Sequence, residues 1–576
     1  MNITYKMNTT SSLRIRLALL SFAVFLFSLP LSGQNANVKK AAKAVFSLNT
    51  FRADGTLIGT SYGVFVSSQG EAISQWKLFV GASKAVVIDS QGKKYDVECL
   101  IGANSLYDIC KFQVKGITPS ATVYQESGDV GSPLWFASYK VNSPELISVA
   151  INKTESFSQG AGDGTNKNYS FYIFKGNIPE NKAFSPIFNS RGEIVALSHP
   201  LQSKGTVNAV SALYPADMKF QQLGNSANTL SQSNIPTILP ADYKNAQVAL
   251  MFAGQQRKDE SYSSFVDYFI SKFPSKPDGY EARARIYASS GQYESSASDM
   301  EKAISVAEDK AAMHFSYSNM ILQKCTYMPN DTFALWTLEK ATEEIEKACV
   351  IEQNPVYVEQ KAKILYVKQD YQKAYELYMQ LQDTHLAGPE TMLAATQCQQ
   401  AMGADFNVII EHMDSTIAVC PKPLTYQSAP YIFERGLIYQ GAGQFRSAIF
   451  DYNEYEKLMV GNRIHPDFYY NRFICEREAR LYKQALDDIN KAISLNPYEP
   501  IYLCEKGSLE LRLKMTDEAI ASANKAIIIN SSFADAYAIL GAAQCVKGKK
   551  HEGLLNLERA KELGYANADT LIERYK

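Results

Sequence analysis

Residues 469–497 read YYNRFICEREARLYKQALDDINKAISLNP, and the same pattern of residue types recurs in three neighbouring stretches, residues 431–455, 503–530 and 537–564. Equivalent positions in the first half of each copy are Gly436, Phe473, Gly507 and Gly541. The steps between these positions are 37, 34 and 34 residues. A fixed period in this range predicts an array of helical hairpins, each too small to bury its apolar face alone.

The residue types fit such hairpins. Small residues stand where two helices must approach closely, namely Gly436, Gly507, Gly541, Ala448, Ala485 and Ala519. Pro497 closes one copy, because proline cannot continue a helix. The pattern resembles the tetratricopeptide repeat (TPR) family, and the residues that carry the resemblance in the copy quoted first are Tyr469, Ala485, Ile489, Ala492 and Pro497.

Weaker copies extend the helical pattern over residues 241–576, about nine hairpins, with a terminal capping helix at residues 568–574. The resemblance implies a superhelix whose concave groove binds peptides or proteins. The positions that usually face that groove in the family correspond to Phe433, Gln440, Tyr470, Arg477, Glu478, Ser508 and Arg512. These residue types also fit a solvated face that binds nothing.

Chain length, net charge and cysteine content narrow the classes of function. The chain has 576 residues and a net charge of −1, which gives no electrostatic argument for nucleic acid as a partner. Nine cysteines occur without CxxC spacing, so no metal site and no cofactor is predicted. Cys99 and Cys110 lie on consecutive predicted strands, where a disulfide is one alternative and two core thiols the other.

The start of the chain has the order of an export signal. Arg14 and Arg16 precede an apolar run at residues 17–29, and small residues follow at Ser32 and Gly33. We expect a signal peptide over residues 1–33, and an uncleaved anchor is the alternative. The expected location is periplasmic or extracellular, with no integral membrane segment after cleavage. The sequence does not define an oligomeric state.

Residues 38–223 follow a different pattern. Short alternating or β-rich runs are separated by Gly, Asn and Ser turns, which predicts an all-β domain. The expected strands are residues 44–51, 59–67, 71–75, 85–89, 94–101, 109–114, 134–139, 146–152, 169–174, 186–189 and 194–198. Two sets of about six short strands predict a sandwich or a double barrel.

This region resembles the HtrA-type trypsin-like serine proteases. Residues 61–114 (SYGVFVSSQGEAIS…YDICKFQV) resemble the first barrel of that family, and residues 127–154 and 172–198 resemble parts of the second. The resemblance implies a chymotrypsin/trypsin-like double barrel. HtrA-type proteins usually continue into PDZ domains, whereas this chain continues through a polar, proline-bearing stretch at residues 224–240, expected to be a linker, into the helices.

The resemblance does not extend to the catalytic chemistry. In this register Lys77 stands at the position of the general base, Asp108 at that of the orienting aspartate, and Ala183 at that of the nucleophile. Asn181 replaces the glycine that opens the oxyanion loop. Alanine offers no nucleophile, and an ordinary lysine ammonium cannot accept a proton at neutral pH. Loss of both groups should lower kcat by on the order of 10⁶.

Several alternatives accompany this interpretation. Ser185 is two positions from the expected nucleophile, and a Ser185–Lys77 dyad would give a divergent active peptidase. Asp108 persists either because it accepts backbone hydrogen bonds or because Lys77 pairs with it. The string GAGDGT at residues 160–165 is expected to be a loop, and His199 a core or surface histidine.

The sequence therefore predicts an exported, non-catalytic scaffold that binds proteins or peptides. In this hypothesis a pseudoprotease domain is joined to a TPR superhelix. The alternative is a divergent serine peptidase that uses Ser185 or an unrecognised nucleophile, with the repeats recruiting its substrates.

Overall fold

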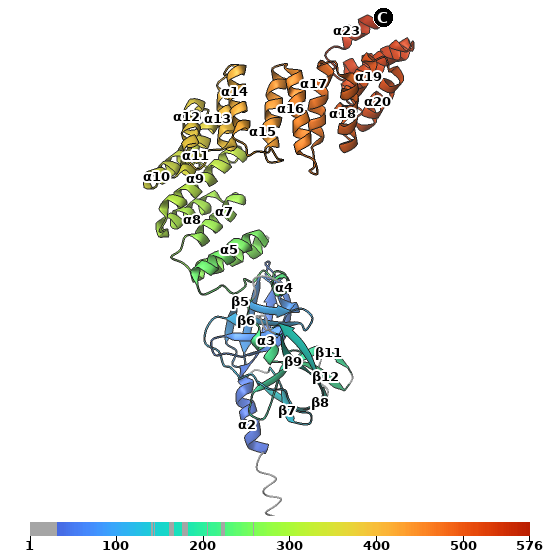
Figure 1. The fold of residues 1–576 in the computed structure, drawn as a ribbon. Helices are drawn as coiled ribbons and strands as arrows, with labels where there is room; N and C mark the ends of the chain where they lie inside the picture. The colour runs from blue at the N-terminus through green and yellow to red at the C-terminus, as the bar shows by residue number, and fades with distance from the viewer. Residues whose placement is uncertain are drawn as a thin grey trace, which may run out of the picture. The chain divides into compact units, whose positions relative to one another are not determined.

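The computed structural model describes residues 31–139, 142, 144–160, 166–175, 182–203, 205–220, 225–256 and 259–576. The expected signal peptide lies almost wholly outside these residues. The chain divides into two compact units, Met1–Met313 and His314–Lys576. Figure 1 shows the strands and helices of both, and each unit is described by itself below.

The first six strands close into a barrel in the order β1-β2-β3-β6-β5-β4. They are β1 Val45–Phe51, β2 Leu57–Phe65, β3 Glu71–Gln75, β4 Lys84–Asp89, β5 Lys94–Asn104 and β6 Ile109–Val114. All neighbouring strands pair antiparallel. The alternation of apolar residues places Phe46, Phe65 and Phe112 inside, where their rings pack on one another.

Six further strands close into a second barrel in the order β10-β11-β12-β9-β8-β7. They are β7 Pro133–Ser138, β8 Glu145–Gly160, β9 Asn166–Lys175, β10 Pro186–Phe188, β11 Ile194–Ser203 and β12 Thr206–Ser211. The sequence pattern did not predict β12. This strand closes the barrel because it pairs with both β11 and β9.

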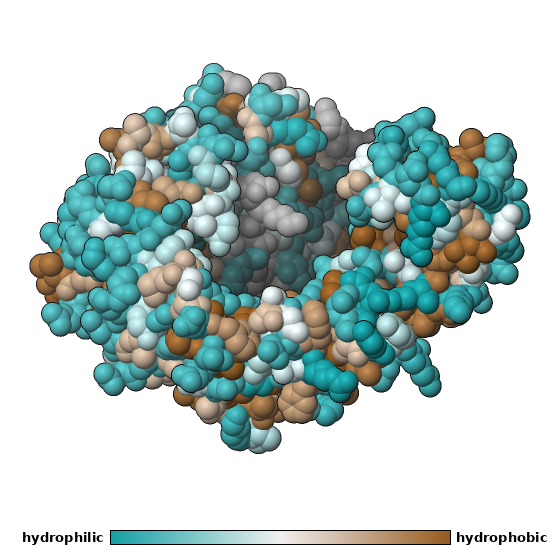
Figure 2. Space-filling model, turned by 90° about the horizontal axis from the view of Figure 1, so that it is seen from above, coloured by the Kyte–Doolittle hydropathy of each residue, from teal (hydrophilic) through white to brown (hydrophobic). Residues whose placement is uncertain are grey.

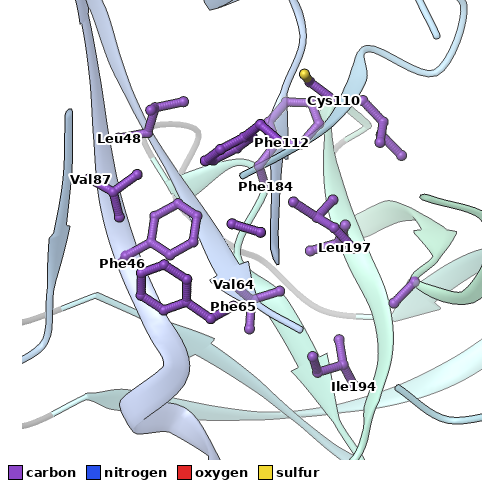
Figure 3. Packing of buried hydrophobic residues seen from close by; sticks show 14 of the residues in the cluster. Phe46, Leu48, Val64, Phe65, Val87, Cys110, Phe112, Phe184, Ile194 and Leu197 are labelled. Atoms are coloured by element: carbon purple, nitrogen blue, oxygen red, sulfur yellow. The ribbon is translucent and has the colours of Figure 1, made fainter. Parts of the chain in front are cut away.

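One cluster of buried side chains includes residues from both barrels. Phe112 of the first barrel and Phe184 and Leu197 of the second belong to it, and Figure 3 shows them close together. The disulfide between Cys99 and Cys110 is not formed, and both thiols are free. In the ladder between β5 and β6, Cys99 lies opposite Gln113 and Cys110 lies opposite Ala103. The two cysteines therefore stand at different places along the ladder.

The helices of the first unit are α2 Leu31–Ala41, α3 Leu213–Asp217, α4 Asn225–Leu230, α5 Tyr243–Gln256, α6 Asp259–Lys272, α7 Asp278–Ser289 and α8 Tyr293–Val306.

The segment predicted to be a linker is packed against the first barrel. The Leu100 N–H donates to the carbonyl of Pro236, and the Ile238 N–H donates to that of Leu100, both at 2.8 Å. Ile235 is buried in the barrel core. The apolar residues scattered through this polar stretch explain why it packs here, because their side chains are buried against the barrel.

Helix α6 also contacts the first barrel. The hydroxyl of Tyr268 donates to Cys99 Sγ at 3.3 Å, and Lys272 pairs with Glu98 at 3.0 Å. Cys99 belongs to the same buried cluster as Phe265 and Phe269 of α6. Strand β5 therefore carries part of the core of the first helical hairpin.

The second unit is a series of antiparallel helices. They are α9 Lys310–Tyr327, which begins at the boundary, α10 Leu338–Ile351, α11 Pro355–Val367, α12 Tyr371–Gln380, α13 Pro389–Ala401, α14 Phe406–Ala418, α15 Ala429–Gly441, α16 Phe445–Leu458, α17 Pro466–Glu478, α18 Tyr482–Leu495, α19 Pro500–Arg512, α20 Thr516–Ile529, α21 Ala534–Val546, α22 Lys550–Glu562 and α23 Ala568–Tyr575. The four best predicted hairpins correspond to α15–α16, α17–α18, α19–α20 and α21–α22. The predicted capping helix is α23.

The small residues stand where the helices of a hairpin touch. A Cβ atom at Gly541 would lie 2.6 Å from the Gly553 carbonyl oxygen, and one at Gly436 would lie 2.7 Å from the Tyr452 ring. Ala485 is fully buried in the α17–α18 hairpin. Hydrophilic residues predominate on the face shown in Figure 2, with hydrophobic ones interspersed. Within the described ranges, no helix is both long enough and apolar enough to span a bilayer.

Candidate functional site

Asp108 lies between β5 and β6 with a left-handed backbone, φ 52°. Its Oδ1 accepts the backbone N–H of Lys77 at 2.6 Å, and its Oδ2 accepts the side-chain amide of Gln75 at 2.8 Å. Its carbonyl oxygen accepts the N–H of Trp76 at 3.0 Å. The carboxylate therefore fixes the chain that follows β3, as the backbone-bonding alternative for Asp108 predicted.

Lys77 begins the short 3-10 helix η2 Lys77–Phe79, and its side chain is exposed. No ion pair within 4.0 Å joins Lys77 to Asp108 in the described part of the chain, so the predicted pairing is wrong. Because backbone and amide N–H groups already satisfy the Asp108 carboxylate, the ammonium group stays in water and avoids the cost of desolvation.

The segment around the expected nucleophile leads into β10. Ala183 is partly buried, and Phe184 adopts a left-handed backbone with φ 62° while its ring is buried. Ser185 has no exposed surface, and its Oγ has no hydrogen-bond partner among the described residues. The Ser185–Lys77 dyad is therefore not formed. Asn181 and most of the predicted loop at residues 160–165 lie outside the described residues.

His199 follows Ser198 on β11 and is buried. Its ring centroid lies 6.1 Å from that of Phe184. Burial lowers the pKa of His199, and the Asp108 carboxylate opposes this shift only in part. The structure thus brings a buried imidazole into the field of the Asp108 carboxylate. Sequence reasoning missed this proximity because β11 and the β5–β6 turn are far apart in the chain.

Two of the predicted groove residues contribute to the core of the helical array. The ring of Phe433 lies 5.6 Å from Tyr452 and 5.1 Å from Tyr455, centroid to centroid. The ring of Tyr470 lies 5.2 Å from that of Tyr502. Both side chains are partly buried, so each presents only part of its surface to a ligand.

The polar groove candidates differ in how firmly they are held. Gln440 accepts the Tyr452 hydroxyl at 2.5 Å. Arg477 pairs with Glu478 at 3.0 Å and with Glu505 at 2.5 Å.

Ser508 and Arg512 are both exposed, and the Arg512 guanidinium lies 5.8 Å from the Tyr482 ring centroid. All seven candidates stand on α15, α17 and α19, the first helices of three successive hairpins.

A cavity of about 810 Å³ lies in the first unit. It is lined by residues of β3, β5, β6 and β9, by the segment after α3 and by Ile238, Leu239 and Pro240. The Nζ of Lys111 donates there to the carbonyl of Ala216 at 2.9 Å and pairs with Glu71 at 3.2 Å. Lys77, Asp108 and Ala183 do not line it. The described residues contain no group of three or more His, Cys, Asp or Glu placed to hold a metal ion.

No family model matches the chain. Two curated proteins are each 32% identical to part of it: the TPR repeat-containing thioredoxin TDX of Arabidopsis thaliana over 84 residues, and the human RNA polymerase II-associated protein 3 over 95 residues. These matches cover 15% and 16% of this chain. The chain spans 22% and 14% of the lengths of these relatives.

Among solved structures, the chain is similar to the active form of the Rv3671c protease from M. tuberculosis, with a TM-score of 0.28 and 12% identity over 34% of this chain and 89% of that one. It is also similar to a serine endoprotease from Yersinia pestis, with a TM-score of 0.26 and 16% identity over 32% of this chain and 64% of that one. Likeness at this level carries no functional argument. The chain thus consists of a β-barrel region followed by a long helical region with TPR-type relatives.

Proposed function

We propose that the chain is an exported, non-catalytic scaffold, in which a trypsin-type double barrel that has lost its catalytic groups is joined to a TPR superhelix that binds proteins or peptides in the cell envelope. Residues 38–223 form the pseudoprotease domain and residues 241–576 the binding domain in this proposal. The partner is a protein or peptide, and no cofactor is required.

The observation that carries the proposal is the state of the three triad positions. Ala183 has no nucleophilic atom, Lys77 directs its side chain into solvent, and Asp108 binds the N–H groups of Lys77 and Gln75. Ser185, the nearest hydroxyl, is fully buried and lacks a hydrogen-bond partner in the described structure. A nucleophile needs an adjacent base within hydrogen-bond reach and access to the substrate.

The helical region supports the binding half of the proposal. Its residues Ser508 and Arg512 are exposed on α19, and Arg477 and Glu478 present paired charges on α17. Exposed polar groups and partly exposed aromatic rings on successive first helices suit the recognition of an extended peptide. The identity between the TPR-containing thioredoxin and this chain is consistent with that use.

The test is a peptidase assay on the purified chain with unfolded casein. The wild-type protein and a Lys77→His, Ala183→Ser double variant are compared with a buffer control. We expect no cleavage by the wild type. Cleavage by the double variant would support the assignment of Lys77 and Ala183 to the base and nucleophile positions.

A second measurement addresses the rival function. A fluorophosphonate probe labels activated serine nucleophiles, and we expect no labelling of the wild-type chain. Labelling that is lost on Ser185→Ala, together with casein cleavage, would contradict the scaffold proposal and establish a divergent peptidase. Labelling that survives Ser185→Ala would indicate an unrecognised nucleophile.

Export has its own test. N-terminal sequencing of the protein recovered from the cell envelope or the medium should find a chain that begins near Gln34. A chain that keeps residues 1–33 would contradict cleavage and favour the anchor.

A further inference from the structure

Three helical hairpins contain the same ion pair, in which the aspartate is buried and the arginine at least partly so. In α15–α16, Nε and Nη2 of Arg435 bind the two carboxylate oxygens of Asp451 at 2.9 and 2.7 Å. In α17–α18, Arg472 binds Asp488 in the same two-pronged way at 2.6 and 3.0 Å. The α7–α8 hairpin repeats it with Arg283 and Asp299. We call this arrangement the Arg–Asp fork.

The α19–α20 hairpin lacks the Arg–Asp fork. One repeat of 34 residues after Arg472 and Asp488, the chain has Lys506 and Ser522. The Nζ of Lys506 lies 3.6 Å from Glu510, a residue of its own helix, and Glu510 also accepts the hydroxyl of Ser522 at 2.7 Å. The second helix therefore supplies no carboxylate to the lysine.

A pocket of about 330 Å³ lies where the fork is missing. It is lined by Ile493, Pro497, Leu503, Lys506, Ser522, Lys525, Ile528 and Ile529. Two of these residues are cationic and none is acidic. Lys525 makes no ion pair with any described residue, whereas its equivalents Lys491 and Arg559 pair with Glu456 and Glu562.

The apolar rim of the pocket also departs from the repeat. Ile528 keeps 83% of its surface exposed. At the equivalent positions of the neighbouring hairpins the chain has Lys457, Ser494 and Glu562, all of them polar. A strongly exposed isoleucine therefore occurs at this position in the hairpin that has also lost the fork. Ile528 adds to the apolar lining from Ile493, Leu503 and Ile529, and an apolar surface rimmed by polar side chains is typical of interaction sites.

We propose that this pocket binds an acidic segment of a partner protein, with a carboxylate of the partner against Lys506 and Lys525 and a neighbouring aliphatic side chain against Ile493, Leu503 and Ile528. The partner's carboxylate takes the place of the aspartate that three other hairpins, α7–α8, α15–α16 and α17–α18, supply internally. The proposal rests on the proposed function and adds a site outside the seven groove candidates.

An acidic peptide fits better than a fatty acid. The exposure of Ile528 leaves the pocket open along one side, whereas a small-molecule site normally encloses most of its ligand. A peptide side chain needs only a short apolar surface next to the charge. Its backbone continues outside the pocket.

The test begins with a random peptide-display selection on the full-length chain. Binders of a Lys506→Arg, Ser522→Asp double variant are removed first. This variant restores the Arg–Asp fork, so the carboxylate that the peptide would provide is already present in the hairpin. We expect the remaining peptides to be enriched in Asp or Glu next to Leu, Ile or Val. Peptides without acidic residues would overturn the proposal.

The best selected peptide is then labelled and measured by fluorescence polarisation. We expect Lys525→Glu and the fork-restoring variant each to weaken binding by more than tenfold, and salt to weaken binding to the wild type. Lys483→Glu is the matched control, because it makes the same charge change at an exposed lysine of the neighbouring hairpin, outside the pocket. A Gln analogue of the peptide should bind weakly.

Two outcomes would overturn the proposal. If the peptide binds all variants equally, its site lies elsewhere, and the scaffold function survives without this pocket. If laurate displaces the peptide and its own binding depends on Lys525, the pocket belongs to an acyl carboxylate. Should the double variant fail to fold, Lys525→Glu decides alone, because that side chain is exposed and makes no ion pair in the described structure.

Discussion

At the scale of single residues, the Asp108 carboxylate has a structural role that needs no catalytic partner. Asp108 holds the N–H of Lys77 at 2.6 Å and the amide of Gln75 at 2.8 Å, so it organises the chain after β3 whether or not a base stands nearby. A hydrogen bond to a charged acceptor contributes about 1.5–3 kcal/mol. These hydrogen bonds give a structural reason for an aspartate at residue 108 that does not depend on catalysis.

Glu476 on α17 is a buried acid whose charge is poorly compensated. It is 4% exposed, and its Oε2 has no hydrogen-bond partner in the described structure. Burial, followed by the nearby charge of Asp488, raises its pKa from 4.5 to about 8, and the cations Arg472 and Lys491 offset this only in part. The folded protein therefore holds a proton on Glu476 at neutral pH.

The sign of the pH dependence follows from this pKa. Between pH 4.5 and about pH 8 the unfolded chain releases a proton that the folded chain keeps, so stability falls as the pH rises through this window. We expect Glu476→Gln to flatten the fall and to stabilise the protein by about 1–3 kcal/mol at pH 9. Urea unfolding followed by circular dichroism at pH 6 and pH 9 measures this.

The exposed Glu518→Gln serves as the control for that experiment and should leave the slope unchanged. An identical pH slope in wild type and Glu476→Gln would contradict the assignment.

At single positions, the sequence tells which chemical group is present. It does not tell whether the side chain points into the core or into solvent. The absence of a nucleophile at residue 183 can be read from the sequence alone. The exposure of Lys77, the burial of Ser185 and the packing of Phe433 among aromatic rings cannot, because each depends on which way a side chain turns.

At the scale of elements, the Arg–Asp fork joins the two helices of one hairpin, and its arginine can also contact the preceding hairpin. Arg472 and Asp488 are each 5% exposed, and Arg472 also pairs with Glu456 of the preceding hairpin at 2.7 Å. Removing one partner from a buried pair leaves an uncompensated charge.

We expect Asp488→Ala to destabilise the protein by about 3–5 kcal/mol, and an Arg472→Met, Asp488→Leu double variant to cost much less. Denaturant midpoints of Arg472→Met alone, Asp488→Leu alone and the double variant form a double-mutant cycle. If the double variant is destabilised by the sum of the two single effects, Arg472 and Asp488 are not energetically coupled.

Close helix contacts give a second prediction at this scale. A Cβ atom at Gly541 would meet the backbone of Gly553 at 2.6 Å, so Gly541→Ala should separate α21 from α22 and cost about 1–3 kcal/mol. Gly441, near the end of α15, has no atom within 4 Å of such a Cβ. Gly441→Ala should therefore be neutral or stabilising by up to about 1 kcal/mol. Thermal unfolding of both variants measures the difference.

The sequence predicted most elements well because their periodicity is strong. Eleven of the twelve strands in the described ranges and the four best hairpins follow directly from apolar spacing. Strand β12 was missed because its run, TVNAVS, is short and interrupted by Asn208. Its role in closing the barrel depends on pairing with two distant strands.

At the scale of the whole molecule, the segment predicted to be a linker, residues 224–240, docks on the first barrel. It pairs with Leu100, and α6 covers Cys99, neither of which follows from its polar composition. Composition describes the average residue, whereas docking here depends on a few apolar side chains such as Ile235.

The thiol of Cys99 reports on this docking. Burial raises its pKa to about 12, and Tyr268 covers it. At pH 8 we expect Cys99 to react with a maleimide far more slowly than the less buried Cys349. Tyr268→Ala should increase the labelling of Cys99 while leaving that of Cys349 unchanged. Mass spectrometry of the labelled peptides measures both, and equal rates in the wild type would contradict the contact.

The interrupted series of forks also bears on how the array loses its structure. Arg435 reaches back to Asp414 of α14 and Arg472 to Glu456 of α16, so charge pairs bind each hairpin from α14 to α18 to the one before it. The fork ends at α19, where Lys506 finds a carboxylate on its own helix. In a linear array, stability depends on such couplings between neighbouring hairpins. Arg477 of α17 still pairs with Glu505 of α19. The charge coupling that keeps the helices from α19 onward folded with the preceding hairpin therefore depends on this pair and not on a fork.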